Sequence, residues 1–127
     1  MIILALYMPM MTATGGNTGS QAATVVIRAI ALGQVTDAEW LKIIWKEARI
    51  SAMLSVCVGG LVFVKIAFLS SVSLLPPNMT FQFVGFFISL SIAMQVMTSA
   101  LVGAGLPLLV RKLGGDPAVA ASPAITT

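Results

Sequence analysis

Residues 9–24 have the sequence PMMTATGGNTGSQAAT, a polar and glycine-rich stretch inside an uncharged run that covers 1–27. Apolar residues flank it on both sides, at 2–6 and at 25–27. Polar amides at membrane depth are costly unless they face a partner or a water-filled path. We therefore expect this stretch to be the functional centre of the chain.

The composition favours lipid rather than water as the solvent around the folded chain. Hydrophobic residues make up 58% of the 127 residues and charged residues 9%, whereas soluble domains carry about 25% charged residues. A helical span needs about 20 mostly apolar residues, so this length allows three or four crossings. We predict an all-α fold, an integral membrane helical bundle, in which 1–127 is part of one transmembrane domain. The net charge of +3 comes without a basic patch interleaved with aromatics, so nucleic acid is not an expected partner.

Start and stop signals predict helices at about 1–32, 37–69, 80–112 and 116–127. The first three are expected to span the membrane. The last is the start of a fourth span, so the chain is expected to be a fragment of a longer protein.

The boundaries of these helices carry recognisable signals. Thr36 and Glu39 have the spacing of a capping box, and Asp116-Pro117 is typical of an N-cap followed by the first helical residue. Trp40 and Trp45 lie among Lys and Arg residues, which predicts an interfacial amphipathic helix at the headgroup level leading into the second span.

The distribution of basic residues predicts the orientation. Bases are frequent in 28–49 and occur again at Arg111 and Lys112, whereas 70–79 contains none. By the positive-inside rule, the connections at 28–49 and 111–116 are cytoplasmic and the loop at 70–79 is outside. The expected location is the cell membrane, as a multi-pass protein.

The residues offer no enzyme constellation, so an enzyme is not expected. The four acids, Asp37, Glu39, Glu47 and Asp116, all lie at predicted water-facing ends, and histidine is absent. The available chemistry is that of oxygen dipoles, which suit hard cations such as Mg²⁺. Selectivity filters use neutral oxygens in this way.

Two sets of polar residues repeat at helical spacing. Asn17, Gln21 and Thr24 share one face of the first helix, and an ion path and interhelical hydrogen bonds are both open explanations for them. For the second set we favour interhelical hydrogen bonds, because no glycine-rich distortion accompanies it. That set comprises Ser91, Gln95 and Thr98.

The motif Gly15-Gly16-Asn17-Thr18-Gly19-x-Gln21, preceded by Pro9 and followed by Arg111-Lys112-Leu113-Gly114 and Asp116-Pro117-Ala118, resembles the membrane domain of MgtE-type magnesium transporters. The resemblance covers essentially the whole chain. It implies a homodimer with five helices per subunit in the lipid bilayer, of which this chain holds the second to fourth and the start of the fifth. It also implies a channel-like pore on the dimer axis that passes hydrated Mg²⁺ inward.

The resemblance also assigns metal-contacting positions. Asn17 and the backbone carbonyl of Ala13 would face the ion path, Gln21 would lie one turn further in, and Ser122 and Thr126 would contribute from the last helix. Ala13 and Ser122 depart from the family, which often has Gly and Asn there. The family's pore aspartate would fall a few residues past Thr127.

Two alternatives remain beside Mg²⁺ transport. One is a transporter of other divalent cations, Mn²⁺ or Co²⁺, or a cation exchanger, because neutral oxygen ligands do not rank metals strongly. The other is a non-transporting structural helix bundle, in which Asn17 and Gln21 would pair fully with other helices.

Overall fold

The computed structural model describes residues 2–35, 39–68 and 81–119 and forms three long helices in this part of the chain. They are α1 (Ile2–Ala31), α2 (Trp40–Phe68) and α3 (Phe81–Lys112). The sequence placed them at about 1–32, 37–69 and 80–112. The described residues contain no strand, which confirms the all-α prediction.

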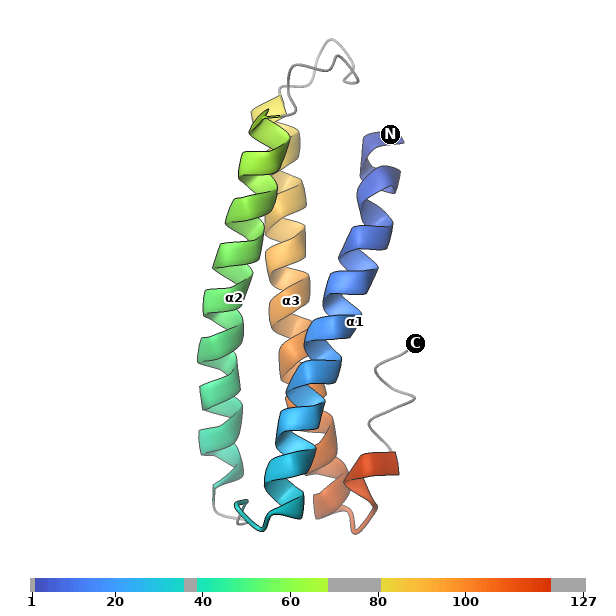
Figure 1. Ribbon diagram of the computed structural model, residues 1–127, viewed down its shortest axis with the longest axis vertical. Helices are drawn as coiled ribbons and strands as arrows, with labels where there is room; N and C mark the ends of the chain where they lie inside the picture. The colour runs from blue at the N-terminus through green and yellow to red at the C-terminus, as the bar shows by residue number, and fades with distance from the viewer. Residues whose placement is uncertain (1, 36–38, 69–80, 120–127) are drawn as a thin grey trace.

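The three helices lie side by side, with α3 packed against both α1 and α2 (Figure 1). The chain runs in the same direction in α1 and α3 and in the opposite direction in α2. The end of α1, the start of α2 and the end of α3 therefore meet at one end of the bundle. Arg28, in the last turn of α1, and Arg111 and Lys112, in the last turn of α3, thus lie at this end.

The contact between α2 and α3 is built on a stripe of buried residues repeated every three or four positions along α2. At Gly59 the two backbones approach closely: an added β-carbon would lie 3.2 Å from the Ser89 carbonyl oxygen and 3.3 Å from the Ala93 β-carbon. Small residues allow this approach between helices. The stripe consists of Glu47, Ser51, Ser55, Gly59, Val62 and Ile66.

Glu47 corrects the expectation that all four acids lie at water-facing ends. Its side chain is only 9% exposed. The physical reason is its register, since Glu47 lies one helical turn before Ser51 and thus continues the stripe that faces α3.

The contact between α1 and α3 depends on glycine. An added β-carbon at Gly15 would lie 2.7 Å from Gln95 Nε2, and one at Gly19 would lie 3.1 Å from the Ser99 carbonyl oxygen. One turn further along α3, Gly103 packs directly on the backbone of Gly19. The Gly15–Gly19 spacing is the small-xxx-small pattern that lets helices approach closely, and α3 is the partner helix.

Glycine also ends the first helix. Gly33 has φ +67°, and the amides of Gly33 and Gln34 donate to the carbonyls of Ile30 and Ala29, at 3.0 Å each. This pattern is a Schellman motif. Gly114, with φ +80°, ends α3 through the equivalent bonds to Arg111 and Val110.

The sequence predicts a further helix after α3, from about residue 116. Residues 117–119 are helical. Asp116 Oδ1 accepts a hydrogen bond of 2.9 Å from the amide of Ala118, which is the geometry of an N-cap. The remainder of the predicted helix, and Thr36 of the predicted capping box, lie outside the described residues.

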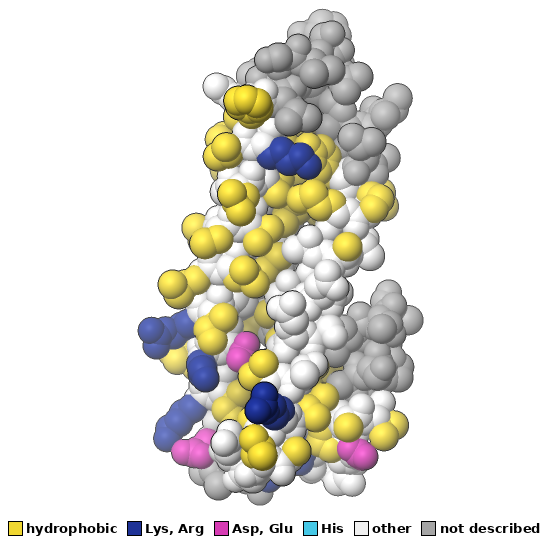
Figure 2. Space-filling view, viewed as in Figure 1, with side chains coloured by type: hydrophobic (Ala, Val, Ile, Leu, Met, Phe, Trp, Pro, Cys, Tyr) yellow, Lys and Arg dark blue, Asp and Glu magenta, His cyan; other side chains and the backbone are white. Residues whose placement is uncertain are grey.

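The outer surfaces of α2 and α3 are largely apolar. Met53 and Val56 of α2 are each 73% exposed, and hydrophobic side chains are spread along the left-hand side of the view in Figure 2, with Lys and Arg gathered mainly towards its lower end. Such a surface suits lipid and not water. Two described segments are long and apolar enough to cross a membrane, Trp40–Phe68 and Gln82–Lys112. α1 has the length, at 30 residues, but its polar stretch lowers its hydropathy.

Candidate functional site

The polar stretch of α1 divides into two faces. Successive residues of an α-helix are rotated by about 100°, so Asn17 lies about 200° from both Gly15 and Gly19. Those glycines are buried against α3, whereas Asn17 is exposed. The polar amide therefore points away from the glycine contact.

The three predicted site residues of α1 share this outward face. Ala13, Asn17 and Gln21 are each exposed and follow one another at intervals of one turn. Neither amide side chain forms a hydrogen bond with another helix in the part of the chain that the structure describes. Ser122 and Thr126, the other two predicted site residues, lie outside the described residues.

Threonine hydroxyls add oxygen acceptors along the same helix. The hydroxyl of Thr24 donates to the Ser20 carbonyl at 2.8 Å, and that of Thr18 donates to the Thr14 carbonyl at 2.8 Å. A hydroxyl that gives its proton to its own helix offers only lone pairs to other groups. These hydroxyls can therefore accept a hydrogen bond from a water molecule.

The second predicted polar set does not form a face of interhelical hydrogen bonds, so that interpretation was wrong for two of its members. Ser91 donates to Phe87 O at 2.8 Å and Thr98 donates to Met94 O at 2.8 Å, both within α3. Sequence spacing cannot distinguish such local bonds from bonds between helices. Gln95 packs against Gly15 of α1.

The site has the character of an uncharged oxygen surface. The described residues contain no group of three or more His, Cys, Asp or Glu side chains that could hold a metal ion. Amide and hydroxyl oxygens of this kind suit a cation that keeps its hydration water, because water protons can donate to them.

A bundle of long helices with an apolar outer surface and bases near one end is a helical membrane protein. The chain belongs to the MgtE family, described as divalent cation transporters, whose sequence profile matches residues 8–127. This confirms the resemblance found in the sequence, and a transporter family agrees with the expectation that the chain is not an enzyme.

Three relatives, each a magnesium transporter MgtE, match nearly the whole chain. The protein from Thermus thermophilus is 35% identical over 98% of this chain, and that from Bacillus subtilis is 30% identical over 99%. The protein from Enterococcus faecalis is 31% identical over 98% of the chain. The chain spans about a quarter of the length of these relatives, at 25%, 26% and 26%.

Proposed function

We propose that this chain is the membrane-embedded part of a Mg²⁺ transporter and that the ion path runs along the outward face of α1. The observation that carries the proposal is the exposure of Ala13, Asn17 and Gln21 opposite the glycine contact with α3. A polar face on a helix flanked by apolar residues needs either a protein partner or water. The three relatives, each named as a magnesium transporter, support Mg²⁺ as the cargo.

The proposed path binds the hydration shell of the ion and not the bare ion. Mg²⁺ dehydrates reluctantly and usually keeps several waters. The amide oxygens of Asn17 and Gln21 and the Ala13 carbonyl accept hydrogen bonds from those waters. Ser122 and Thr126 face the same path from the helix that begins at Asp116.

A second copy of the chain supplies the facing wall in this proposal. A homodimer places two α1 helices on either side of one path, which covers the polar face that α3 leaves open. All three helices cross the membrane, and the helix that starts at Asp116 begins a fourth crossing. The basic end of the bundle, at 28–49 and 111–116, is cytoplasmic by the positive-inside rule, and 70–79 is outside.

Mg²⁺ uptake into proteoliposomes that contain the full-length protein tests the proposal. Asn17→Ala and Gln21→Ala should each lower the uptake rate by about tenfold or more, since a hydrogen bond that involves a charged group is worth roughly 1.5–3 kcal/mol. Gln82→Ala removes an exposed amide at the start of α3 and serves as the control. Uptake that survives both α1 substitutions would refute the assigned path.

Two further measurements separate the alternatives. Competition by Mn²⁺ and Co²⁺ in the same uptake assay distinguishes a general divalent cation transporter from one selective for Mg²⁺. A general transporter, which is how the family is described, would lose Mg²⁺ uptake when either competitor is added. Labelling of single cysteines along 13–24 by a water-soluble thiol reagent, in a Cys57→Ala background, distinguishes a non-transporting bundle. A water-lined path gives strong labelling at 13, 17 and 21 and weak labelling at 15, 19 and 22.

A further inference from the structure

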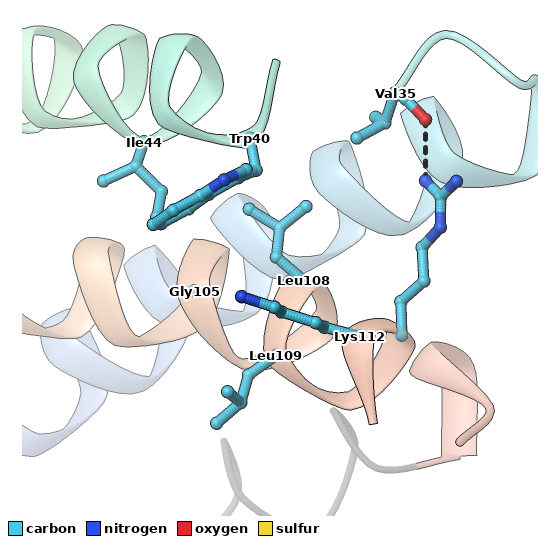
Figure 3. A pocket seen from close by; sticks show the side chains of 8 residues that line it. Val35, Trp40, Ile44, Gly105, Leu108, Leu109 and Lys112 are labelled. Atoms are coloured by element: carbon cyan, nitrogen blue, oxygen red, sulfur yellow. Dashed lines mark hydrogen bonds between the residues drawn. The ribbon is translucent and has the colours of Figure 1, made fainter. Parts of the chain in front are cut away.

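A hollow of about 690 Å³ lies between the start of α2 and the end of α3. Trp40 and Ile44 of α2 and Leu108 and Leu109 of α3 form its apolar wall (Figure 3). The volume is within the range of about 300–1,000 Å³ that is common for ligand pockets. The wall can therefore hold a substantial length of hydrocarbon.

Two cationic side chains line the same hollow, and none of its lining residues is acidic. The ammonium of Lys112 lies 5.8 Å from the centroid of the Trp40 ring, a cation–π contact that holds it beside the apolar wall. Arg111 Nη1 donates to the Val35 carbonyl oxygen at 2.8 Å. A guanidinium has five N–H donors, so Arg111 keeps donors for a second acceptor.

Two acids close in sequence to the lining residues, Glu39 and Asp116, do not themselves line the hollow. Glu39, which precedes Trp40 in the chain, forms an ion pair of 3.5 Å with Lys42. The hollow thus combines a cationic rim with an apolar wall, and its complement is an anion attached to a hydrocarbon chain.

The position of the hollow fits the membrane interface. Tryptophans and bases mark the headgroup level of membrane helices, and Trp40, Trp45 and Lys112 are all at this end of the bundle. From Trp40 to Ile44, and from Leu109 to Gly105, the lining extends towards the middle of the bundle. Basic pockets between membrane helices on the cytoplasmic side bind anionic lipid headgroups.

We propose that this hollow binds one anionic phospholipid, with its phosphate at Arg111 and Lys112 and an acyl chain along Ile44 and Leu108. The proposal rests on the membrane placement in the proposed function but not on Mg²⁺ transport. Lipid binding and ion uptake are separate measurements, so either proposal can fail while the other stands.

The first test fills the hollow without changing its charge. An added β-carbon at Gly105 meets no atom within 4 Å, so Gly105→Leu places a side chain in open space of the hollow. Gly60→Leu is the matched control, because Gly60 is also helical and open but lies in α2 outside the hollow. Native mass spectrometry of the full-length protein in detergent then measures binding of phosphatidylglycerol and of phosphatidylcholine with identical acyl chains.

We expect the unmodified protein and Gly60→Leu to retain phosphatidylglycerol in preference to phosphatidylcholine, and Gly105→Leu to lose that bound lipid. Equal retention of phosphatidylglycerol by the two variants would overturn the proposal. So would equal binding of the two lipids by the unmodified protein.

The second test removes charge and keeps the apolar wall. Lys112→Gln should weaken phosphatidylglycerol binding about fivefold, the effect of one basic residue near an anionic membrane surface. Lys46→Gln removes a charge of α2 that is also exposed but lies outside the hollow, and it should leave binding unchanged. Equal effects of the two substitutions would overturn the proposal, as would displacement of the lipid by inorganic phosphate at the same concentration.

Discussion

The carbonyl oxygen of Gly19 lies where a side chain on Gly103 would begin. A β-carbon on Gly103 would also lie 2.9 Å from the α-carbon of Gly19. Both neighbours are backbone atoms, which cannot rotate aside as a side chain can. This contact fixes the rotation of α1 about its axis, and Asn17, two residues before Gly19, consequently points away from α3.

Gly103→Ala should therefore destabilise the protein by about 1–3 kcal/mol, the usual cost of inserting a methyl group into a packed interface. Gly105→Ala is the control, since it makes the same chemical change two residues along α3 where no atom lies within 4 Å. Thermal unfolding in detergent micelles measures both variants. A midpoint for Gly103→Ala equal to that of Gly105→Ala would show that α1 and α3 do not cross at this point.

Two neighbouring glycines of α2 provide a second matched pair. Gly59 faces the Ser89 carbonyl oxygen and the Ala93 β-carbon, whereas Gly60 faces open space. Gly59→Leu should lower the unfolding midpoint, because its side chain pushes α2 away from α3. Gly60→Leu should leave the midpoint unchanged or raise it slightly, since leucine is a better helix former than glycine by somewhat under about 1 kcal/mol. If Gly60→Leu lowered the midpoint more than Gly59→Leu, the face of α2 that contacts α3 would be the one that carries Gly60, contrary to the structure.

The sequence alone was sufficient to predict the approximate positions of α1, α2 and α3, but not which of them pack against each other. Long apolar runs and glycine or proline residues determine where a membrane helix begins and ends, and Gly33 and Gly114, both with positive φ, follow the ends of α1 and α3. The Gly15–Gly19 spacing is typical of a close helix contact. The partner in this contact is α3, through Gly103. No local sequence pattern could identify it, because Gly19 and Gly103 are far apart in the chain.

The candidate site was predictable to a similar extent. Helical spacing placed Asn17 and Gln21 on one face, and the structure adds that this face lies away from the α3 contact. The hydroxyls of Ser91 and Thr98 have the same kind of spacing but bond within their own helix, because a carbonyl one turn back is always within reach. The burial of Glu47 had a signal in the sequence, because Glu47, Ser51 and Ser55 follow one another at intervals of four residues.

The bond between Arg111 and Val35 joins the segment after α1 to the end of α3. Val35 is 4% exposed, and its carbonyl oxygen accepts from Arg111 Nη1 at 2.8 Å. Arg111→Met removes the donor and leaves the Val35 carbonyl without this hydrogen bond. The substitution should destabilise this local contact by about 1–3 kcal/mol. The segment that follows Gly33 should then open more often.

Hydrogen exchange at the Gln34 amide reports this opening, because that amide donates to the Ala29 carbonyl in the cap of α1. We expect its exchange to accelerate about tenfold or more in Arg111→Met, the ratio that corresponds to a local loss of about 1.4 kcal/mol. Lys112→Met removes a neighbouring positive charge from the same helix end, so it controls for the interaction of that charge with the helix dipole. Equal acceleration in the two variants would show that charge at the end of α3, and not the bond to Val35, holds this segment in place.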